Sequence, residues 1–434
     1  MSTRRIPPPD HPMTILTIPT PEVVRLSNRL QVWLLRDKRA PVVEFRLTIP
    51  TGGRAYDDAE WVGLASATAR LMTAGTKKRT SLQISDEAER YGGGIGFSAN
   101  TETAGMNAHC LSQHLEPMMS LIADVLLNPT FPEDEVNIDR ANTLQRLALQ
   151  RSQPDFLVEE RFRQALFGSH PYSRLAPDEN AVQRWSSEQL QTFYRRHYRP
   201  EGATLIVVGD FRKRSLLRLL EDVLGEWQGS SEGEAIDEPT SEVAELGFHL
   251  VPRANSVQSN LLIGTLCPPR NAPDSIPLQL GVSVLGAGAS SRLFLTVREQ
   301  CGYAYSVGAN LDHYLRLSAF SAYAQTATEN THDALRQIQS EIARLVQEPV
   351  PAQELQATKN YLLGRHALGW VTLGSIADRL TQLATHNLPM EYWHQYPELV
   401  QSTTASQIQQ ACARYLAPER MTTVVVGDES LQQK

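Results

Sequence analysis

An arginine and a tyrosine seven positions apart, Arg298 and Tyr305, carry side chains that can assist acyl chemistry. A guanidinium fork and a phenol can both donate hydrogen bonds to a carbonyl oxygen, and both can stabilise the oxyanion that forms when water attacks it. Spacing alone favours a plainer interpretation, in which Arg298 pairs with Glu299 or another carboxylate and Tyr305 is a packed strand residue. Tyr303 is a second candidate, because strand alternation around Ala304 would place both tyrosines on one face.

Residues 63–76 have the frame of a metal-binding helix, but they lack metal ligands. Their flanks resemble the zinc helix of the pitrilysin-type (M16) metallopeptidases, roughly Gly-Leu-Ala-His-x-x-Glu-His-Met-x-x-x-Gly-Thr. In that family the two histidines bind zinc and the glutamate is the general base. The corresponding positions of this chain are Ser66, Ala69 and Arg70.

The resemblance also implies a third zinc ligand, a glutamate about 76 positions after the second histidine. That count leads from Arg70 to Arg146, in a region that resembles the acidic helix of the family. A guanidinium has no free lone pair, keeps its proton in proteins and repels a divalent cation. We therefore expect no metal site and no cofactor in this chain.

Residues 291–307 resemble a second family signature, roughly Ser-Arg-Leu-Phe-x-x-Val-Arg-Glu-x-x-Gly-Leu-Ala-Tyr-Ser-Val. In active relatives its arginine and tyrosine reach toward the substrate bound at zinc. The resemblance thus assigns Arg298 and Tyr305 to substrate and transition-state contacts, and it shifts the balance away from the plainer interpretation.

The chain is similar to itself at an offset of 218 positions, since the surroundings of the apolar run 204–208 recur around 422–426. Repetition over such a distance indicates duplicated domains. The acidic segment between the halves has few large apolar residues, which is typical of a linker. We predict an N-terminal peptidase-like domain with the degenerate zinc site at 14–228, a linker at 229–243 and a C-terminal peptidase-like domain with the Arg/Tyr segment at 244–430.

Both halves mix strand and helix periodicity. Apolar and polar residues alternate over 43–49, as in a half-buried strand, whereas helical spacing recurs over 115–126 and 335–345. These patterns predict an α+β fold in which each domain has a mainly antiparallel sheet with helices on one face. The resemblance implies that the two homologous domains face each other like a clam shell around a peptide chamber.

Composition narrows the function classes. A net charge of −7 disfavours a nucleic-acid binder, and the sequence has no apolar run long enough for a membrane span. Four widely spaced cysteines are typical of free thiols in a reducing compartment, and we expect Cys301 to be a buried small residue. The start of the sequence lacks the apolar core of a signal peptide, which favours the cytoplasm, or the periplasm if a signal peptide has been removed.

These observations favour a non-catalytic subunit of a heterodimeric zinc peptidase, not a peptidase alone. A homologous partner would bring zinc and the general base, and this chain would close the chamber on peptide substrates and supply Arg298 and Tyr305 in trans. The alternative is a structural or assembly scaffold, like the zinc-less core subunits of the respiratory bc1 complex. A third interpretation, a peptidase with relocated ligands, requires stoichiometric zinc in the purified chain.

Overall fold

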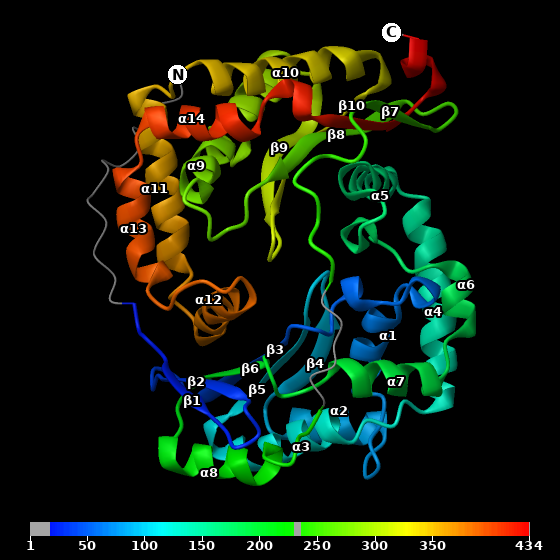
Figure 1. Ribbon diagram of the computed structural model, residues 1–434, viewed down its shortest axis with the longest axis vertical. Coiled ribbons are helices and arrows are strands. Elements are labelled where there is room, and N and C mark those ends of the chain that lie inside the picture. Colours follow the sequence, from blue (N-terminus) through cyan, green and yellow to red (C-terminus); the bar gives the residue numbers. More distant parts are fainter. Residues whose placement is uncertain (1–17, 230–235, 434) are drawn as a thin grey trace, which may run out of the picture.

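The computed structural model of the protein describes residues 18–229 and 236–433. Two β-sheets lie at opposite ends of the molecule, with helices around and between them (Figure 1). The first sheet consists of β1 (Glu22–Arg25), β2 (Gln31–Arg36), β3 (Val42–Ile49), β4 (Gly94–Ala99), β5 (Ala104–Leu111) and β6 (Thr204–Gly209). The second consists of β7 (Gly247–Pro252), β8 (Gln258–Cys267), β9 (Ala304–His313), β10 (Ser318–Ala327) and β11 (Thr422–Gly427).

The helices follow the same division into halves. Those of the first half are α1 (Leu64–Leu71), α2 (Ser81–Arg90), α3 (Leu115–Leu127), α4 (Glu133–Arg151), α5 (Pro154–Phe167), α6 (Glu179–Arg184), α7 (Ser187–His197) and α8 (Lys213–Leu224). Those of the second are α9 (Ser275–Gly286), the π-helix η5 (Phe294–Gln300), α10 (Thr331–Gln347), α11 (Ala352–Leu368), α12 (Leu373–Thr385), α13 (Tyr392–Ser402) and α14 (Ala405–Tyr415). Short 3-10 turns are η1 (Arg54–Tyr56), η2 (Ala59–Trp61), η3 (Ser112–His114), η4 (Pro171–Ser173), η6 (Thr328–Asn330), η7 (Pro418–Arg420) and η8 (Glu429–Gln433).

The two sheets share one plan. The strand order is β1-β2-β6-β3-β5-β4 in the first sheet and β7-β11-β8-β10-β9 in the second. In both, the repeated apolar strand, β6 or β11, runs parallel to one neighbour and antiparallel to the other. All other pairings are antiparallel, so the predicted α+β class with mainly antiparallel sheets is confirmed. The predicted strand over 43–49 lies in β3, and the predicted helices lie in α3 and α10.

Each sheet is covered by its own helices on one face and by a helix of the other half on the opposite face. In the first sheet, Leu205 and Val207 of β6 face the core beneath α3 and α8, whereas Ile206 and Val208 pack with α12 of the second half. In the second sheet, β8 and β11 pack against α5 of the first half. Figure 1 shows α5 beside the second sheet and α12 beside the first. Cover on both faces explains why β6 and β11 are buried throughout and carry the unbroken apolar runs 205–208 and 424–426.

We call α5 and α12 the exchanged helices, because each packs on the sheet of the other half. Polar contacts also join the two halves. Arg46 Nε of β3 lies 2.9 Å from Asp378 Oδ1 of α12. Between the halves, the carboxylate of Glu102 accepts hydrogen bonds from the backbone N–H of Leu315, with N–O distances of 2.8 and 2.9 Å. The two halves are therefore joined by shared packing as well as by the chain connection.

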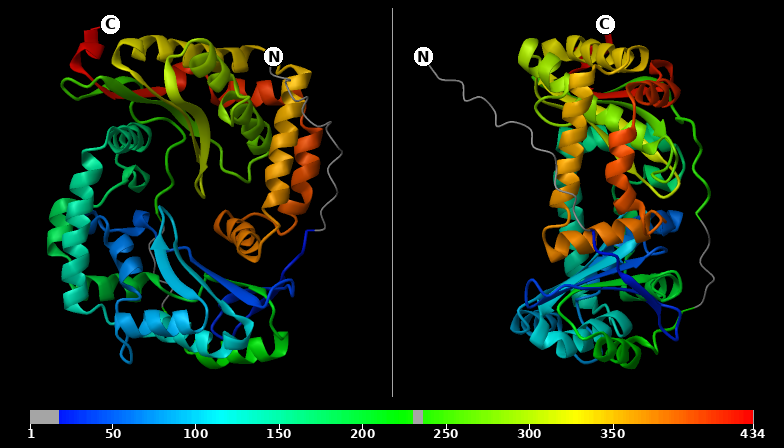
Figure 2. Two further views of the ribbon diagram at one scale, coloured as in Figure 1. Left: turned by 180° about the vertical axis from the view of Figure 1, so that it is seen from behind. Right: turned by 90° about the vertical axis from the view of Figure 1, so that its left-hand side faces the viewer.

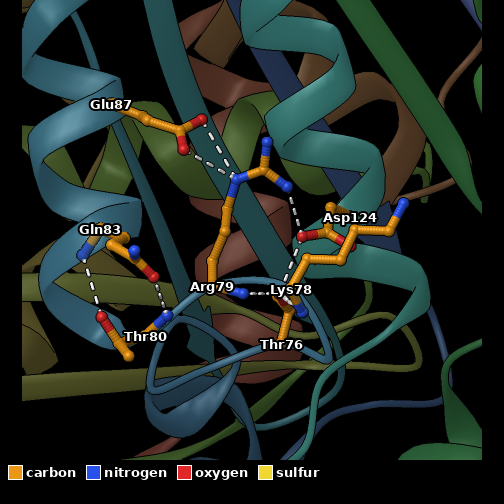
Figure 3. A network of polar contacts seen from close by, with 7 residues as sticks. All are labelled: Thr76, Lys78, Arg79, Thr80, Gln83, Glu87 and Asp124. Atoms are coloured by element: carbon orange, nitrogen blue, oxygen red, sulfur yellow. Dashed lines mark hydrogen bonds and ion pairs between the residues drawn. The ribbon is translucent and has the colours of Figure 1, made fainter.

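The turn from α1 to α2 is fixed by a partly buried polar network (Figure 3). Arg79 lies between two carboxylates, with its Nε 3.0 Å from Glu87 Oε1 and its Nη1 2.6 Å from Asp124 Oδ2. The Thr76 hydroxyl donates to Asp124 Oδ2 at 2.8 Å, and Thr80 forms a capping box at the start of α2. These bonds tie the turn that follows α1, and the start of α2, to α3.

The halves are arranged as a clam shell, as expected. α4 runs along one side between the two sheets, and α11 and α13 run along the other (Figures 1 and 2). The boundaries at 14–228, 229–243 and 244–430 stay predictions, and residues 14–17 and 230–235 lie outside the described residues. Within the described parts of the chain, no helix is both long enough and apolar enough to cross a membrane.

Candidate functional site

Helix α1 carries three of the four degenerate zinc-motif positions, Ser66, Ala69 and Arg70, and its start is specified by glycine and aspartate. Gly63 has a φ of 103°, and a Cβ there would lie 2.4 Å from Cβ of Pro177. The buried carboxylate of Asp57 accepts hydrogen bonds from the backbone N–H groups of Gly63 and Ala65, both at 2.7 Å. This carboxylate satisfies donors that a helix N-terminus would otherwise leave unpaired, and it sets the rotation of α1.

Three of the four degenerate positions meet around one cavity of about 280 Å³. Ser66 and Arg70 come from adjacent turns of α1, and Arg146 comes from α4 across the cavity. Ala69 is fully buried and does not line this cavity. The sequence count that related Arg70 to Arg146 therefore joins two residues that share a cavity in the folded chain.

The side chains at these positions form a network of their own. Arg70 makes two parallel hydrogen bonds to Asp139, with Nε–Oδ1 and Nη2–Oδ2 distances of 2.8 Å. The hydroxyl of Thr143 accepts from Arg70 Nη2 at 3.1 Å and from Arg146 Nη2 at 3.0 Å. The Asp139 carboxylate near the former ligand positions is thus engaged by a guanidinium.

These residues do not fit a zinc ion. Zinc requires imidazole, thiolate or carboxylate ligands in tetrahedral geometry, and Ser66, Ala69, Arg70 and Arg146 include none of these groups. Across the described residues, no three His, Cys, Asp or Glu side chains lie together as a metal site. The positive charge of the guanidiniums would also repel a divalent cation.

The structure adds residues to this cavity that the sequence did not single out. Arg54 and Arg174 line it together with Asp57. Burial raises the pKa of Asp57 to about 7, in opposition to its hydrogen bonds from Ala65 and Gly63 and to the nearby charges of Arg174 and Arg54. Burial lowers the pKa of Arg54, and the charge of Arg163 lowers it further. Arg54 and Asp57 lie at η1, whereas Arg174 follows η4, so only the fold brings Arg174 together with the other two.

Arg298 and Tyr305 form a stacked pair in the second half. The guanidinium carbon of Arg298 lies 4.9 Å from the ring centroid of Tyr305 and 4.8 Å from that of Phe294. Tyr305 is 80% exposed, so the expectation of a packed core tyrosine does not describe it. Arg298 Nε lies 3.7 Å from Glu299 Oε1, a long and solvent-exposed ion pair of little energetic weight. Within the described chain, nothing else forms a polar contact with either side chain.

The expectation that Tyr303 and Tyr305 share a strand face is wrong. Between β9 and β10, Ala304 pairs with Thr326 and Ser306 pairs with Gln325, so Tyr305 is the extra residue of a β-bulge. A bulge interrupts the alternation of side chains and redirects the inserted one. Tyr303, which precedes β9, is half-buried against the core of the second half, whereas Tyr305 points to solvent. Of the two tyrosines, Tyr305 is the accessible one.

Cys301 also differs from expectation. It is exposed beside Gly302, which has a φ of 65° in the turn that precedes β9. Cys110, Cys267 and Cys412 are buried, and all four thiols are free, as predicted. The turn between η5 and β9 holds Cys301 at the surface, in contrast to the buried position expected from the sequence.

Arg298 and Tyr305 are not among the residues that line the cavity beside α1. The described chain thus has two separate candidate regions, an arginine-lined cavity in the first half and an exposed Arg/Tyr pair in the second.

Comparison with known proteins gives one family for both halves. A family profile described as "Insulinase (Peptidase family M16)" matches residues 31–176, and one described as "Peptidase M16 inactive domain" matches residues 184–362. An uncharacterized zinc protease of Mycobacterium leprae is 28% identical over 330 residues, which cover 76% of this chain and 74% of that protein. An uncharacterized zinc protease of Mycobacterium bovis is 26% identical over 418 residues, which cover 90% of this chain and 94% of that protein.

A solved structure supports the same fold. The crystal structure of a peptidase M16 inactive domain from Pseudomonas fluorescens superposes with a TM-score of 0.85 at 23% identity, covering 94% of this chain and 98% of that one. At this identity the similarity concerns the fold.

Proposed function

Because this chain belongs to the M16 family of peptidases, we propose that it is the non-catalytic subunit of a heterodimeric zinc peptidase. A homologous partner with an intact zinc motif provides the metal and the general base. This chain closes the peptide chamber and places Arg298 and Tyr305 against the substrate held by the partner.

The observation that carries this proposal is the exposed Arg298–Tyr305 pair in a chain whose zinc positions hold no ligand. The β-bulge directs Tyr305 into solvent, where its phenol is free to contact a substrate. The stack on two rings restricts the planar guanidinium of Arg298, so its N–H groups need little further ordering when a substrate arrives.

The chemistry available to this pair is hydrogen bonding to a peptide carbonyl. The guanidinium and the phenol can donate to the carbonyl oxygen and continue to donate as negative charge develops on it. In the cavity of the first half, Arg70 of α1 already forms an ion pair with Asp139. We therefore propose that α1 of this chain takes no direct part in catalysis. Selection by a closed chamber acts on substrate size, so we propose unfolded peptides of broad sequence as substrates.

The test is a peptidase assay on a quenched peptide with three samples: this chain alone, a zinc-motif homologue from the same genome alone, and an equimolar mixture. We expect activity in the mixture only, and loss of that activity with a chelator. Arg298→Ala and Tyr305→Phe should each lower turnover by roughly ten- to a thousandfold, the range for one lost oxyanion donor.

Two matched variants control for general surface effects. Arg336→Ala removes an arginine from the exposed side of α10, and Tyr361→Phe removes the hydroxyl of another exposed tyrosine. Both should leave turnover unchanged. If the mixture forms a complex but Arg298→Ala and Tyr305→Phe retain full turnover, contacts in trans are refuted. No gain on mixing and no complex by size exclusion would favour the scaffold alternative.

A further inference from the structure

The cavity beside α1 is lined by four arginines and a single carboxylate-bearing residue. The arginines are Arg54, Arg70, Arg146 and Arg174, and the acid is Asp57. The Asp57 carboxylate already accepts two backbone N–H groups of α1. The lining therefore carries an excess of positive charge in a partly enclosed space.

Three of these guanidiniums have neutral hydrogen-bond partners. Arg146 donates to the hydroxyl of Thr143 at 3.0 Å, and Arg174 donates to the backbone oxygen of Asp57 at 2.6 Å. Arg54 donates to Thr101 Oγ1 at 3.1 Å and to the backbone oxygen of Leu175 at 3.4 Å. Of the four, Arg70 has a direct carboxylate partner within the described chain, Asp139. The charge of Asp57 is near Arg54 and Arg174 but is not hydrogen-bonded to either guanidinium, so an anion that paired with these groups would stabilise them.

Two buried N–H donors in the lining also have no partner. Nε of Arg54 and Nε1 of Trp185 are buried, and no acceptor among the described residues reaches them. Trp185 is 1% exposed. Unsatisfied buried donors are uncommon in folded proteins, and a ligand that accepts hydrogen bonds accounts for such groups.

We propose that this cavity binds an oxyanion through Arg54, Arg146 and Arg174, at the place where its relatives' zinc motif would stand. Planar guanidinium groups bind carboxylate and phosphate oxygens with paired hydrogen bonds. A volume of about 280 Å³ suits a small anionic group better than a drug-sized ligand or cofactor. The anion is a free inorganic ion such as phosphate or the terminal carboxylate of a peptide.

Binding is measured on this chain alone at low ionic strength, so the result does not depend on the peptidase proposal. Calorimetry with inorganic phosphate tests the free ion. Calorimetry with a short peptide, once with a free C-terminal carboxylate and once amidated, tests the peptide source. Saturable heat with phosphate supports the free-ion source, and heat with the acid but not the amide supports the peptide source. No binding of either probe overturns the proposal.

Variants locate the site. Arg146 is exposed on α4 with one hydroxyl contact, so Arg146→Gln should fold normally and weaken binding of the probe about five- to tenfold. Arg336→Gln, on the distant helix α10, makes the same charge change and should leave affinity unchanged. Equal loss in both variants would mean that anions bind exposed arginines without preference for this cavity, and unchanged affinity in Arg146→Gln would place the anion elsewhere. Either result refutes the assignment.

Discussion

Truncation of Phe162 should destabilise both halves of the chain together, because its helix belongs to one half and packs on the other. Phe162 of α5 is 3% exposed and lies among apolar side chains of β8 and β11, including Leu262 and Val424. A methyl group added to Gly264 of β8 would stand 2.8 Å from Cζ of Phe162, so the ring fills the space directly over the second sheet.

The expected magnitude follows from transfer and cavity terms. Phe162→Ala removes a ring from a closed interface and should lower the free energy of unfolding by about 3–5 kcal/mol. Leu380→Ala, in the reciprocal helix α12, removes a side chain that is 1% exposed and packed with the first sheet, and should cost about 2–5 kcal/mol. Gln164→Ala, at an exposed position of α5, should cost less than about 0.5 kcal/mol.

The assay is urea unfolding followed by hydrogen exchange with mass spectrometry. Peptides from β6 report on the first sheet, and peptides from β11 report on the second. We expect one transition for both sets of peptides in the wild type, and an equal shift of both in Phe162→Ala and Leu380→Ala. Separate transitions, or a shift confined to the sheet that the truncated helix contacts, would show that the two halves do not unfold as one cooperative unit.

Three further predictions concern single side chains. Asp139→Asn should lower the free energy of unfolding by about 1–3 kcal/mol in denaturant titrations, because it breaks the paired bonds to Arg70; a fully stable variant would contradict this. Arg70→His should bind no stoichiometric zinc by elemental analysis, since Ser66 and Arg146 still offer no ligand and Ala69 offers no general base; zinc bound at one equivalent would contradict this expectation. Burial and the charge of Arg379 lower the pKa of His366 to about 4, which is below the value of about 6.5 in the unfolded chain. The neutral imidazole therefore favours the folded state above about pH 6.5. This contribution to stability is lost as the pH falls toward 4, because the unfolded chain binds the proton first. Between pH 7 and 5, His366→Phe should therefore lose about 1–2 kcal/mol less stability than the wild type, and parallel losses would contradict the shift.

The sequence by itself established the family resemblance, the repeat and the absence of zinc ligands at the motif positions. Motif flanks at 63–76 and 291–307 are local, so they are readable without coordinates. The offset of 218 between the apolar runs correctly indicated two sheets with one plan. The unbroken burial of β6 and β11 agrees with cover on both faces of each sheet, but periodicity cannot say which helix provides it.

Tertiary structure determined three features that no local pattern shows. They are the packing of α5 and α12 on the sheets of the opposite halves, the surroundings of α1, and the directions of Tyr303 and Tyr305. The exchange depends on contacts between residues far apart in the chain, which no local pattern encodes. Arg54 and Arg174 join the cavity from unrelated loops for the same reason. Tyr303 and Tyr305 differ because pairing with β10 inserts a bulge at Tyr305, and a register shift arises from the partner strand rather than from the sequence of β9 itself.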